Sequence, residues 1–126
     1  MTNPYKGRHG LDRIVHAVGY SVDGLTSAYR GESAFRQETW AAVVLVPTAF
    51  WLGRDWLQVL LLIGSVVLVM VVELLNSGIE AAIDRISFDR HELSKRAKDQ
   101  ASAAVFLSVM LATATWLTIA WQRFFA

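Results

Sequence analysis

The amino-acid sequence predicts an all-α membrane protein that forms a single domain over residues 1–126. We expect three transmembrane helices preceded by an N-terminal amphipathic surface helix. Three observations support this class: the composition, the grouping of apolar residues into long segments, and the uneven distribution of basic residues between those segments. Hydrophobic residues make up 54% of the chain and charged residues only 18%, against roughly 45–50% and ~25% in soluble domains.

The same composition excludes several classes of protein. A disordered chain needs few apolar residues and a high net charge, whereas this chain has a formal net charge of +1, from 12 Lys and Arg against 11 Asp and Glu. That balance, without a sustained basic stripe, argues against nucleic-acid binding. The chain has no cysteine. A disulfide framework, a thiolate metal site and a cysteine nucleophile are therefore excluded.

The first predicted element is an amphipathic helix over about residues 11–30. Its apolar residues recur at helical spacing and form one stripe, which consists of Leu11, Ile14, Val15, Val18, Val22, Leu25 and Tyr29. The opposite face is polar, as expected for a helix at a surface. Because hydrophobic segments follow, we expect this helix to lie in the membrane interface. Packing of the stripe on a soluble partner is the alternative.

The three predicted spans cover about residues 39–53, 57–75 and 101–121. The second contains 19 residues with one charge, Glu73, and the third contains 21 residues with none. A helix of 19 residues is about 29 Å long, close to the roughly 30 Å hydrocarbon core. The first span is shorter and contains Pro47, which a membrane helix tolerates when its neighbours satisfy the freed carbonyl. The alternative for each segment is a buried core helix.

The basic residues predict how the spans are oriented. Five precede the first span, one follows it, five lie between the second and third spans, and one follows the third. Cytoplasmic loops carry the excess of Lys and Arg. We therefore expect the N-terminus and residues 76–100 in the cytoplasm. Tryptophans lie at or near the span ends, as an aromatic belt requires; they are Trp40, Trp51, Trp56, Trp116 and Trp121.

One acidic residue, Glu73, lies about three residues inside the end of the second span. A charge at the bilayer midplane costs about 2.5–3.5 kcal/mol on insertion scales, so such a residue is a candidate for function. Asn76, Glu80 and Asp84 follow on the same helical face. Carboxylates without cysteine or clustered histidine suit a hard cation such as Mg²⁺, which also binds substrate phosphates. A solvated polar face is the alternative for these residues.

Two further polar clusters are expected on the same side of the membrane. One is Glu32 and Glu38, just before the first span, and the other is residues 91–99, just before the third. In the second cluster Lys98 can meet a phosphate. Gly19 to Gly24 has the glycine spacing of a phosphate-binding loop, but no Lys-Ser/Thr follows and no strand precedes it. Any nucleotide chemistry must therefore use carboxylates, a metal and basic side chains at helix ends.

Several separated motifs fall in a fixed order around the three spans. They are Gly19-Tyr20-Ser21, Glu32-Ser33-Ala34-Phe35-Arg36-Gln37-Glu38, Val72-Glu73-Leu74-Leu75-Asn76-Ser77 with Glu80, Asp84-Arg85-Ile86, and His91-Glu92-Leu93-Ser94 with Arg96-Ala97-Lys98-Asp99. In these motifs the chain resembles the small bacterial integral-membrane diacylglycerol kinase family, which also includes undecaprenol kinases. The resemblance runs from about Arg13 to Trp121. The chain departs from the family's pattern at Asp23, Gly31 and Lys95.

The resemblance implies a homotrimer in the bacterial inner membrane, with active sites between neighbouring protomers. It implies transfer of the γ-phosphate of Mg²⁺-ATP to the hydroxyl of diacylglycerol, which gives phosphatidic acid. Glu73 matches the general base, while Glu32 and Glu80 match the ligands of Mg²⁺ and ATP. The other matches to nucleotide contacts are Arg13, Tyr20, Asp89, Arg90, His91, Lys98 and Asp99. The matches to lipid contacts are Arg13, Ser21, Ala34, Phe35, Arg36, Gln37, Glu38, Trp51, Glu73, Asn76, Ser102 and Trp116.

Three alternatives remain open. An undecaprenol kinase would share the fold and chemistry but would phosphorylate a polyprenol. A small oligomeric transporter would use Glu73 as its coupling carboxylate, although transporters place that group near the midplane. A membrane scaffold would use the small residues Ala104, Ser108 and Ala112 for close helix packing, a feature that an oligomeric enzyme needs equally.

Overall fold

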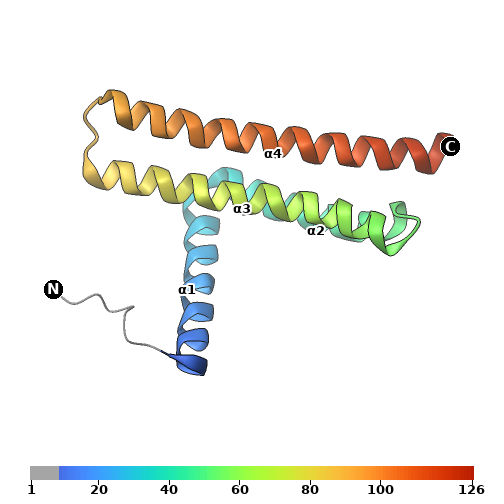
Figure 1. Ribbon diagram of the computed structural model, residues 1–126, viewed down its shortest axis with the longest axis horizontal. Helices are drawn as coiled ribbons and strands as arrows, with labels where there is room; N and C mark the ends of the chain where they lie inside the picture. The colour runs from blue at the N-terminus through green and yellow to red at the C-terminus, as the bar shows by residue number, and fades with distance from the viewer. Residues whose placement is uncertain (1–8) are drawn as a thin grey trace.

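The computed structural model describes residues 9–126, and over that range it contains four α-helices and no strand. They are α1 (Gly10–Gly31), α2 (Ser33–Leu52), α3 (Trp56–Ile86) and α4 (Glu92–Phe125). Helices α2, α3 and α4 run side by side along one axis, and α1 projects crosswise from them (Figure 1). The predicted all-α class is confirmed, and each predicted segment coincides with one of these helices.

The packed core lies at the end of the bundle where α2 turns into α3. Its buried residues are Ala49, Leu52, Leu62 and Ile119, with Ile63, Trp116 and Ala120 packed against them. Leu62 is completely buried. The turn depends on Gly53, because a Cβ atom there would lie 2.7 Å from Cγ2 of Val59 and 2.9 Å from its backbone nitrogen. Only glycine permits the backbone to approach so closely.

The starts of α3 and α4 are fixed by side chains that accept hydrogen bonds from the first helical turn. Oδ1 of Asp55 accepts one from the backbone N–H of Gln58 at 2.9 Å, and Nδ1 of His91 accepts one from the N–H of Leu93 at 3.0 Å. Such caps satisfy N–H groups that have no partner within the helix. Residues 87–91 form the connection between α3 and α4.

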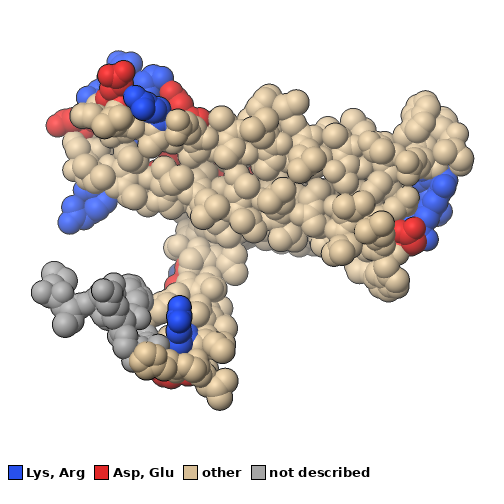
Figure 2. Space-filling model, viewed as in Figure 1, with Lys and Arg blue, Asp and Glu red and all other residues tan. Residues whose placement is uncertain are grey.

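Two helices, α3 and α4, are long and apolar enough to cross a membrane. Their outward surfaces carry exposed apolar side chains such as Leu60, Leu61, Phe106 and Leu107. Figure 2 shows charged side chains gathered at the two ends of the bundle, and the face seen in this view carries almost none between them. This distribution fits helices whose middle parts face lipid. The third predicted span, within α2, remains a prediction.

Helix α1 extends away from the bundle and leaves its apolar stripe uncovered. Leu11, Val15 and Val18 are all largely exposed in the single chain. A soluble monomer rarely exposes a continuous apolar face of this kind. The interfacial location of α1 remains a prediction, which this exposed stripe supports.

Candidate active site

Four carboxylates near the junction of α1, α2 and α3 are close enough for their charges to interact. Glu32 lies between α1 and α2, Glu38 lies on α2, and Glu73 and Glu80 lie on α3. The charge of Glu73 acts on Glu38, and the charges of Glu80 and Glu32 both act on Glu73. We call these four residues the carboxylate cluster. Folding thus joins the acidic motif before the first predicted span to the acidic face of the second.

Glu73 is the most enclosed member of this cluster, with 5% of its surface exposed. One turn further along α3, Nδ2 of Asn76 donates a long hydrogen bond of 3.5 Å to Oε1 of Glu80. The other polar atom of Asn76, Oδ1, is buried and has no hydrogen-bond partner within residues 9–126. Buried polar atoms usually have partners. The cluster therefore leaves an oxygen acceptor free for a ligand.

Glu38 lies one residue before the predicted first span, and it is unsatisfied in the same way. Its Oε2 is buried and has no partner in the described part of the chain. Desolvation by burial, with a smaller contribution from the negative charge of Glu73, raises the pKa of Glu38 to about 7. Glu38 can therefore hold a proton near neutral pH, and in that state it can donate a hydrogen bond to a ligand.

The carboxylate cluster supplies oxygen atoms of the kind that a hard cation binds. Within residues 9–126, no three acidic or histidine side chains already form a metal-binding group. Mg²⁺ does not need one, because it commonly takes one or two carboxylates and completes its coordination with water and substrate phosphates. Glu32 and Glu80 could supply such carboxylates, and Glu80 is hydrogen-bonded to Asn76, whose Oδ1 is unpartnered among the described residues.

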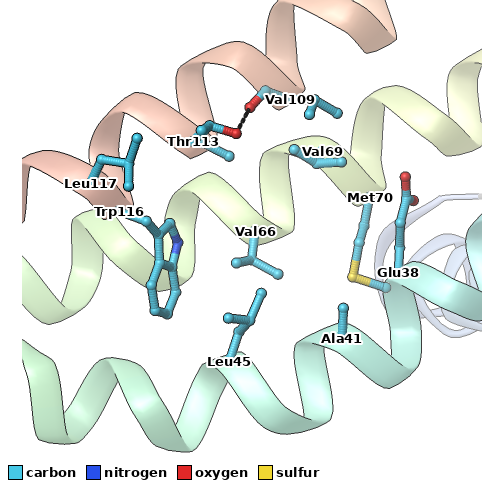
Figure 3. Close-up of a pocket in the computed structure, with 11 residues that line it drawn as sticks. Glu38, Ala41, Leu45, Val66, Val69, Met70, Val109, Thr113, Trp116 and Leu117 are labelled. Carbon is cyan, nitrogen blue, oxygen red and sulfur yellow. Dashed lines mark hydrogen bonds between the residues drawn. The ribbon is translucent and has the colours of Figure 1, made fainter. Parts of the chain in front are cut away.

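An apolar cavity of about 380 Å³ opens between α2, α3 and α4. Its lining residues are Glu38, Ala41, Leu45, Val66, Val69, Met70, Val109, Ala112, Thr113, Trp116 and Leu117. Figure 3 shows the Glu38 carboxylate at one end of this cavity and the Trp116 indole at the other. The cavity volume lies within the range of small-molecule sites, roughly 300–1,000 Å³. Two residues that were predicted to contact lipid, Glu38 and Trp116, therefore line the same cavity.

A second, polar cavity of about 320 Å³ lies at the connection between α3 and α4. Five predicted nucleotide contacts line it together, namely Asp89, Arg90, His91, Lys98 and Asp99. Nζ of Lys98 forms an ion pair with Oδ1 of Asp84 at 2.8 Å, which links α3 to α4. Nζ of Lys95 pairs with Oδ2 of Asp99 at 2.6 Å. Both lysines of this cavity are thus already paired with acidic residues.

A third cavity, of about 640 Å³, separates α1 from α3, and Ser21 and Glu32 both line it. Arg36 binds the end of α1 that borders this cavity. Its Nη1 donates to the backbone oxygens of Tyr29 and Arg30, both at 2.9 Å. These carbonyls at the end of α1 have no partner within the helix. The arginine that was predicted to contact lipid therefore also fixes the break between α1 and α2.

The remaining predicted site residues are dispersed. Arg13 and Tyr20 lie along α1, Ala34 and Gln37 are exposed on α2, Phe35 is buried in the interior, and Ser102 is exposed on α4. Trp51 lies at the opposite end of the bundle, where its ring stacks at 5.8 Å on Phe124. Within a single chain, the acidic residues gather in the carboxylate cluster and the basic residues gather at the polar cavity between α3 and α4. Several other predicted contacts lie away from both places.

Two contacts of the site were not anticipated from the sequence. Asp84 was expected only on the acidic face, and its ion pair with Lys98 depends on how α4 returns along α3. The hydrogen bond from Nε1 of Trp116 to Oγ of Ser65, 3.1 Å long, joins the same two helices. The only signal for it in the sequence is a serine within an apolar span, where a polar side chain often contacts a neighbouring helix.

Comparison with known proteins identifies the family. A family profile described as prokaryotic diacylglycerol kinase matches residues 19–120. The diacylglycerol kinase of Pseudomonas aeruginosa is 50% identical over 117 residues, covering 93% of this chain and 95% of the relative. The diacylglycerol kinase of Escherichia coli K12 is 50% identical over 115 residues, covering 91% and 94%. That of Helicobacter pylori is 43% identical over 107 residues, covering 85% and 84%.

The matched region contains the whole carboxylate cluster and both cavities that it borders, the apolar one through Glu38 and the one beside α1 through Glu32. It also contains the polar cavity between α3 and α4. The chain belongs to the prokaryotic diacylglycerol kinase family.

Proposed function

We propose that this protein is a lipid kinase that transfers the γ-phosphate of Mg²⁺-ATP to the hydroxyl of diacylglycerol and forms phosphatidic acid. The observation that carries the proposal is the position of the carboxylate cluster. Through Glu38 it borders the apolar cavity, and through Glu32 it borders the cavity between α1 and α3, whose lining includes serines of both helices. A phosphoryl transfer from a water-soluble donor to a lipid acceptor needs acidic groups at such a boundary.

Glu73 is proposed as the general base. It would accept the proton of the lipid hydroxyl while that oxygen forms a bond to the γ-phosphorus. The bond between the γ-phosphorus and its bridging oxygen breaks, ADP leaves, and the proton then passes from Glu73 to solvent. Such a base contributes about 10²–10⁴-fold to the rate of a proton transfer. The enclosed position of Glu73 supports this role, because it limits competition by water.

Glu32 and Glu80 are proposed to hold Mg²⁺ with the phosphates of ATP. When bound, the ion would neutralise charge on the phosphates and so favour phosphoryl transfer. Asn76 supports this arrangement, since its Nδ2 donates to Oε1 of Glu80. The unpartnered Oδ1 of Asn76 can accept a hydrogen bond from a bound water molecule or from the lipid hydroxyl.

The polar cavity between α3 and α4 is proposed to bind the nucleotide. Lys98 and Arg90 provide positive charge for the phosphates, and His91 and Asp99 line the same cavity. The ion pair with Asp84 orients the Lys98 ammonium group before the nucleotide arrives. Arg13 and Tyr20 are proposed as further nucleotide contacts from α1.

The lipid is proposed to place its hydroxyl near Glu73 and Glu38, with an acyl chain in the apolar cavity. Both ends of that cavity support this pose, because Glu38 provides a polar group at one end and the remaining lining is almost wholly apolar. Undecaprenol is the alternative acceptor. A long polyprenol would use the same hydroxyl position.

Assembly and topology complete the proposal. We expect a homotrimer in a bacterial inner membrane with the N-terminus in the cytoplasm and active sites between neighbouring copies. The exposed apolar faces of α3 and α4 support contact with lipid or with another copy. The molecular mass of the detergent-solubilised protein and the protease accessibility of its N-terminus test these expectations.

The central experiment measures phosphatidic acid formed by the purified full chain from diacylglycerol and Mg²⁺-ATP. We expect Glu73→Gln to lower turnover about 10²–10⁴-fold while the protein remains folded by circular dichroism. Asp23→Asn, an acid-to-amide change at an exposed position on α1, is the matched control and should keep full activity. Near-normal turnover of Glu73→Gln would contradict the proposed base. Replacing diacylglycerol by undecaprenol in the same assay distinguishes the two acceptors.

A further inference from the structure

We propose that Ser65 and Trp116 together set the length of acyl chain that the apolar cavity accepts. Trp116 closes the end of the cavity away from the carboxylates, and Ser65 holds its indole in place as a positioning residue. This inference rests on the proposed function, because it takes the occupant of the cavity to be an acyl chain of the lipid substrate.

The contact between Ser65 and Trp116 involves the polar side-chain atom of each residue. Nε1 of Trp116 donates to Oγ of Ser65 at 3.1 Å, and the same hydroxyl donates to the backbone oxygen of Leu62 at 2.8 Å. Ser65 is 8% exposed. Since the hydroxyl has one proton, already directed to Leu62, it meets the indole as an acceptor only. The indole therefore has one preferred orientation, set from the facing helix.

The location of the indole makes that orientation matter for the cavity. Trp116 lines the cavity on one side and packs against the core of Ala49, Leu52, Leu62 and Ile119 on the other. In Figure 3 it lies at the far end from Glu38. The lining of α4 runs from Val109 to Leu117, which is about 12 Å of helix. The indole therefore separates a cavity of limited length from the packed core behind it.

The lining of the cavity specifies the chemistry of its occupant. Glu38 contributes a carboxyl group to the lining, and Thr113 contributes its one hydroxyl group. Its Oγ1 donates to the backbone oxygen of Val109 at 2.8 Å, within its own helix (dashed line in Figure 3). The cavity thus offers a carboxyl group at one end and an apolar wall elsewhere. That pattern matches an amphiphile with its polar group at Glu38 and a hydrocarbon chain directed at Trp116.

Losing the hydrogen bond should lengthen the cavity. A buried indole N–H without an acceptor is unfavourable, so in Ser65→Ala the Trp116 side chain is expected to leave its present position. In Trp116→Phe the ring is smaller and needs no acceptor. Either change releases space between the cavity and the core. A longer acyl chain then fits without bending, while a short chain gains nothing.

The test compares kcat/KM for dipalmitoylglycerol with kcat/KM for dioctanoylglycerol in the full-length protein. We expect the ratio of long-chain to short-chain kcat/KM to rise about three- to tenfold in Ser65→Ala and in Trp116→Phe, as for the loss of one hydrogen bond. The double variant should show no larger rise, because both changes remove the same contact. The KM for ATP should stay unchanged. The ratio is independent of the amount of active protein, so a partly folded variant remains informative.

Ser108→Ala is the matched control. Ser108 is also buried, at 6% exposure, and its Oγ donates to the backbone oxygen of Val105 at 2.7 Å, but it does not line the apolar cavity. Its chain-length ratio should equal that of the wild type.

Two results would overturn the inference while leaving the kinase activity intact. One is an unchanged ratio in both Ser65→Ala and Trp116→Phe. The other is an equal loss of activity on both lipids with a change in oligomeric size, which would indicate that a second copy of the chain fills the cavity. If instead the wild type phosphorylates neither diacylglycerol, the proposed function itself is contradicted.

Discussion

The two ends of the helical bundle differ in whether their polar groups have hydrogen-bond partners. At the turn end, which comprises residues 53–55 and the C-terminus, Nη2 of Arg54 donates to the backbone oxygens of Gln122, Arg123 and Ala126. There the Arg123 guanidinium also lies 5.8 Å from the centre of the Trp51 ring. At the site end, which comprises the carboxylate cluster and the connection between α3 and α4, buried oxygens of Glu38 and Asn76 have no partner among the described residues.

This difference separates a structural region from a functional one. Leaving a buried acceptor unsatisfied costs about 1–3 kcal/mol. At the turn end such costs are avoided by helix caps and by the compact core behind them. At the site end they are retained next to two open cavities, where a substrate or a metal-bound water can supply the missing donors. A buried polar atom that lacks a hydrogen-bond partner therefore indicates a functional site.

After Glu73→Gln, the largest effect is expected for substitutions at the proposed metal ligands, which test the role of the site end. Glu32→Gln and Glu80→Gln should each lower kcat/KM for Mg²⁺-ATP about ten- to hundredfold, because each removes a charged interaction with the ion. The Mg²⁺ concentration for half-maximal activity should rise in parallel. A Mg²⁺ titration at saturating ATP and diacylglycerol measures both. An unaltered Mg²⁺ requirement in both variants would show that the ion binds elsewhere.

The next effect distinguishes the two lysines of the polar cavity. Lys98→Ala should raise the KM for ATP about tenfold, since a hydrogen bond to a charged phosphate contributes about 1.5–3 kcal/mol, and it should leave the KM for diacylglycerol unchanged. Steady-state kinetics with each substrate varied in turn provides the measurement. Lys95→Ala removes the other lysine of the cavity, whose ion pair with Asp99 is more exposed than that of Lys98 with Asp84, and it serves as the comparison. Equal effects of the two substitutions would contradict the assignment of Lys98.

A change at the turn end should act on stability and not on chemistry. Arg54→Ala removes the cation that bonds to the last carbonyls of α4. We expect a loss of about 1–3 kcal/mol in the free energy of unfolding, with the turnover of the folded protein preserved. Denaturant unfolding in detergent, combined with activity per folded molecule, separates the two quantities. A drop in turnover without a drop in stability would make the turn end part of the active site.

The smallest effect concerns the proton of Glu38. Its pKa in the folded protein is about 7, above the ordinary value of 4.5, so folding favours the protonated form. The resulting stabilisation is complete below pH 4.5 and is lost as the pH rises through 7. Because Glu38 is partly exposed, we expect a loss of only about 1 kcal/mol.

Denaturant unfolding at a series of pH values measures the effect of this proton. Glu38→Gln should flatten the decline in stability between pH 4.5 and 7, because the amide does not titrate. A decline of the same size in Glu38→Gln and in the wild type would assign it to other groups.

Local sequence features were sufficient to predict much of this arrangement. The apolar spacing before the first span and the two long apolar segments each correspond to an observed helix. The acidic face on which Glu73, Asn76 and Glu80 recur needed only the period of an α-helix. The nucleotide residues near His91 also meet in one cavity, because they are close together in the chain.

Contacts between segments that are far apart in the sequence could not be predicted from these local features. Lys98 was expected to meet a phosphate, yet which acid would hold it depended on the register of α4 against α3. The carboxyl groups of Glu38 and Glu73 come from different helices, and nothing in either motif fixes their approach. The same holds for the closure of the apolar cavity, which requires the indole of Trp116 to reach across to Ser65.

The sequence by itself determined which segments are helical, which are apolar enough to enter a membrane, and which side chains are chemically able to bind a metal ion or accept a proton. These properties follow from the periodicity and composition of neighbouring residues. The tertiary structure alone decided where apolar space remains between the helices, which polar atoms stay without a partner, and which indole closes the cavity. Those properties depend on side chains from separate helices that meet only after the chain has folded.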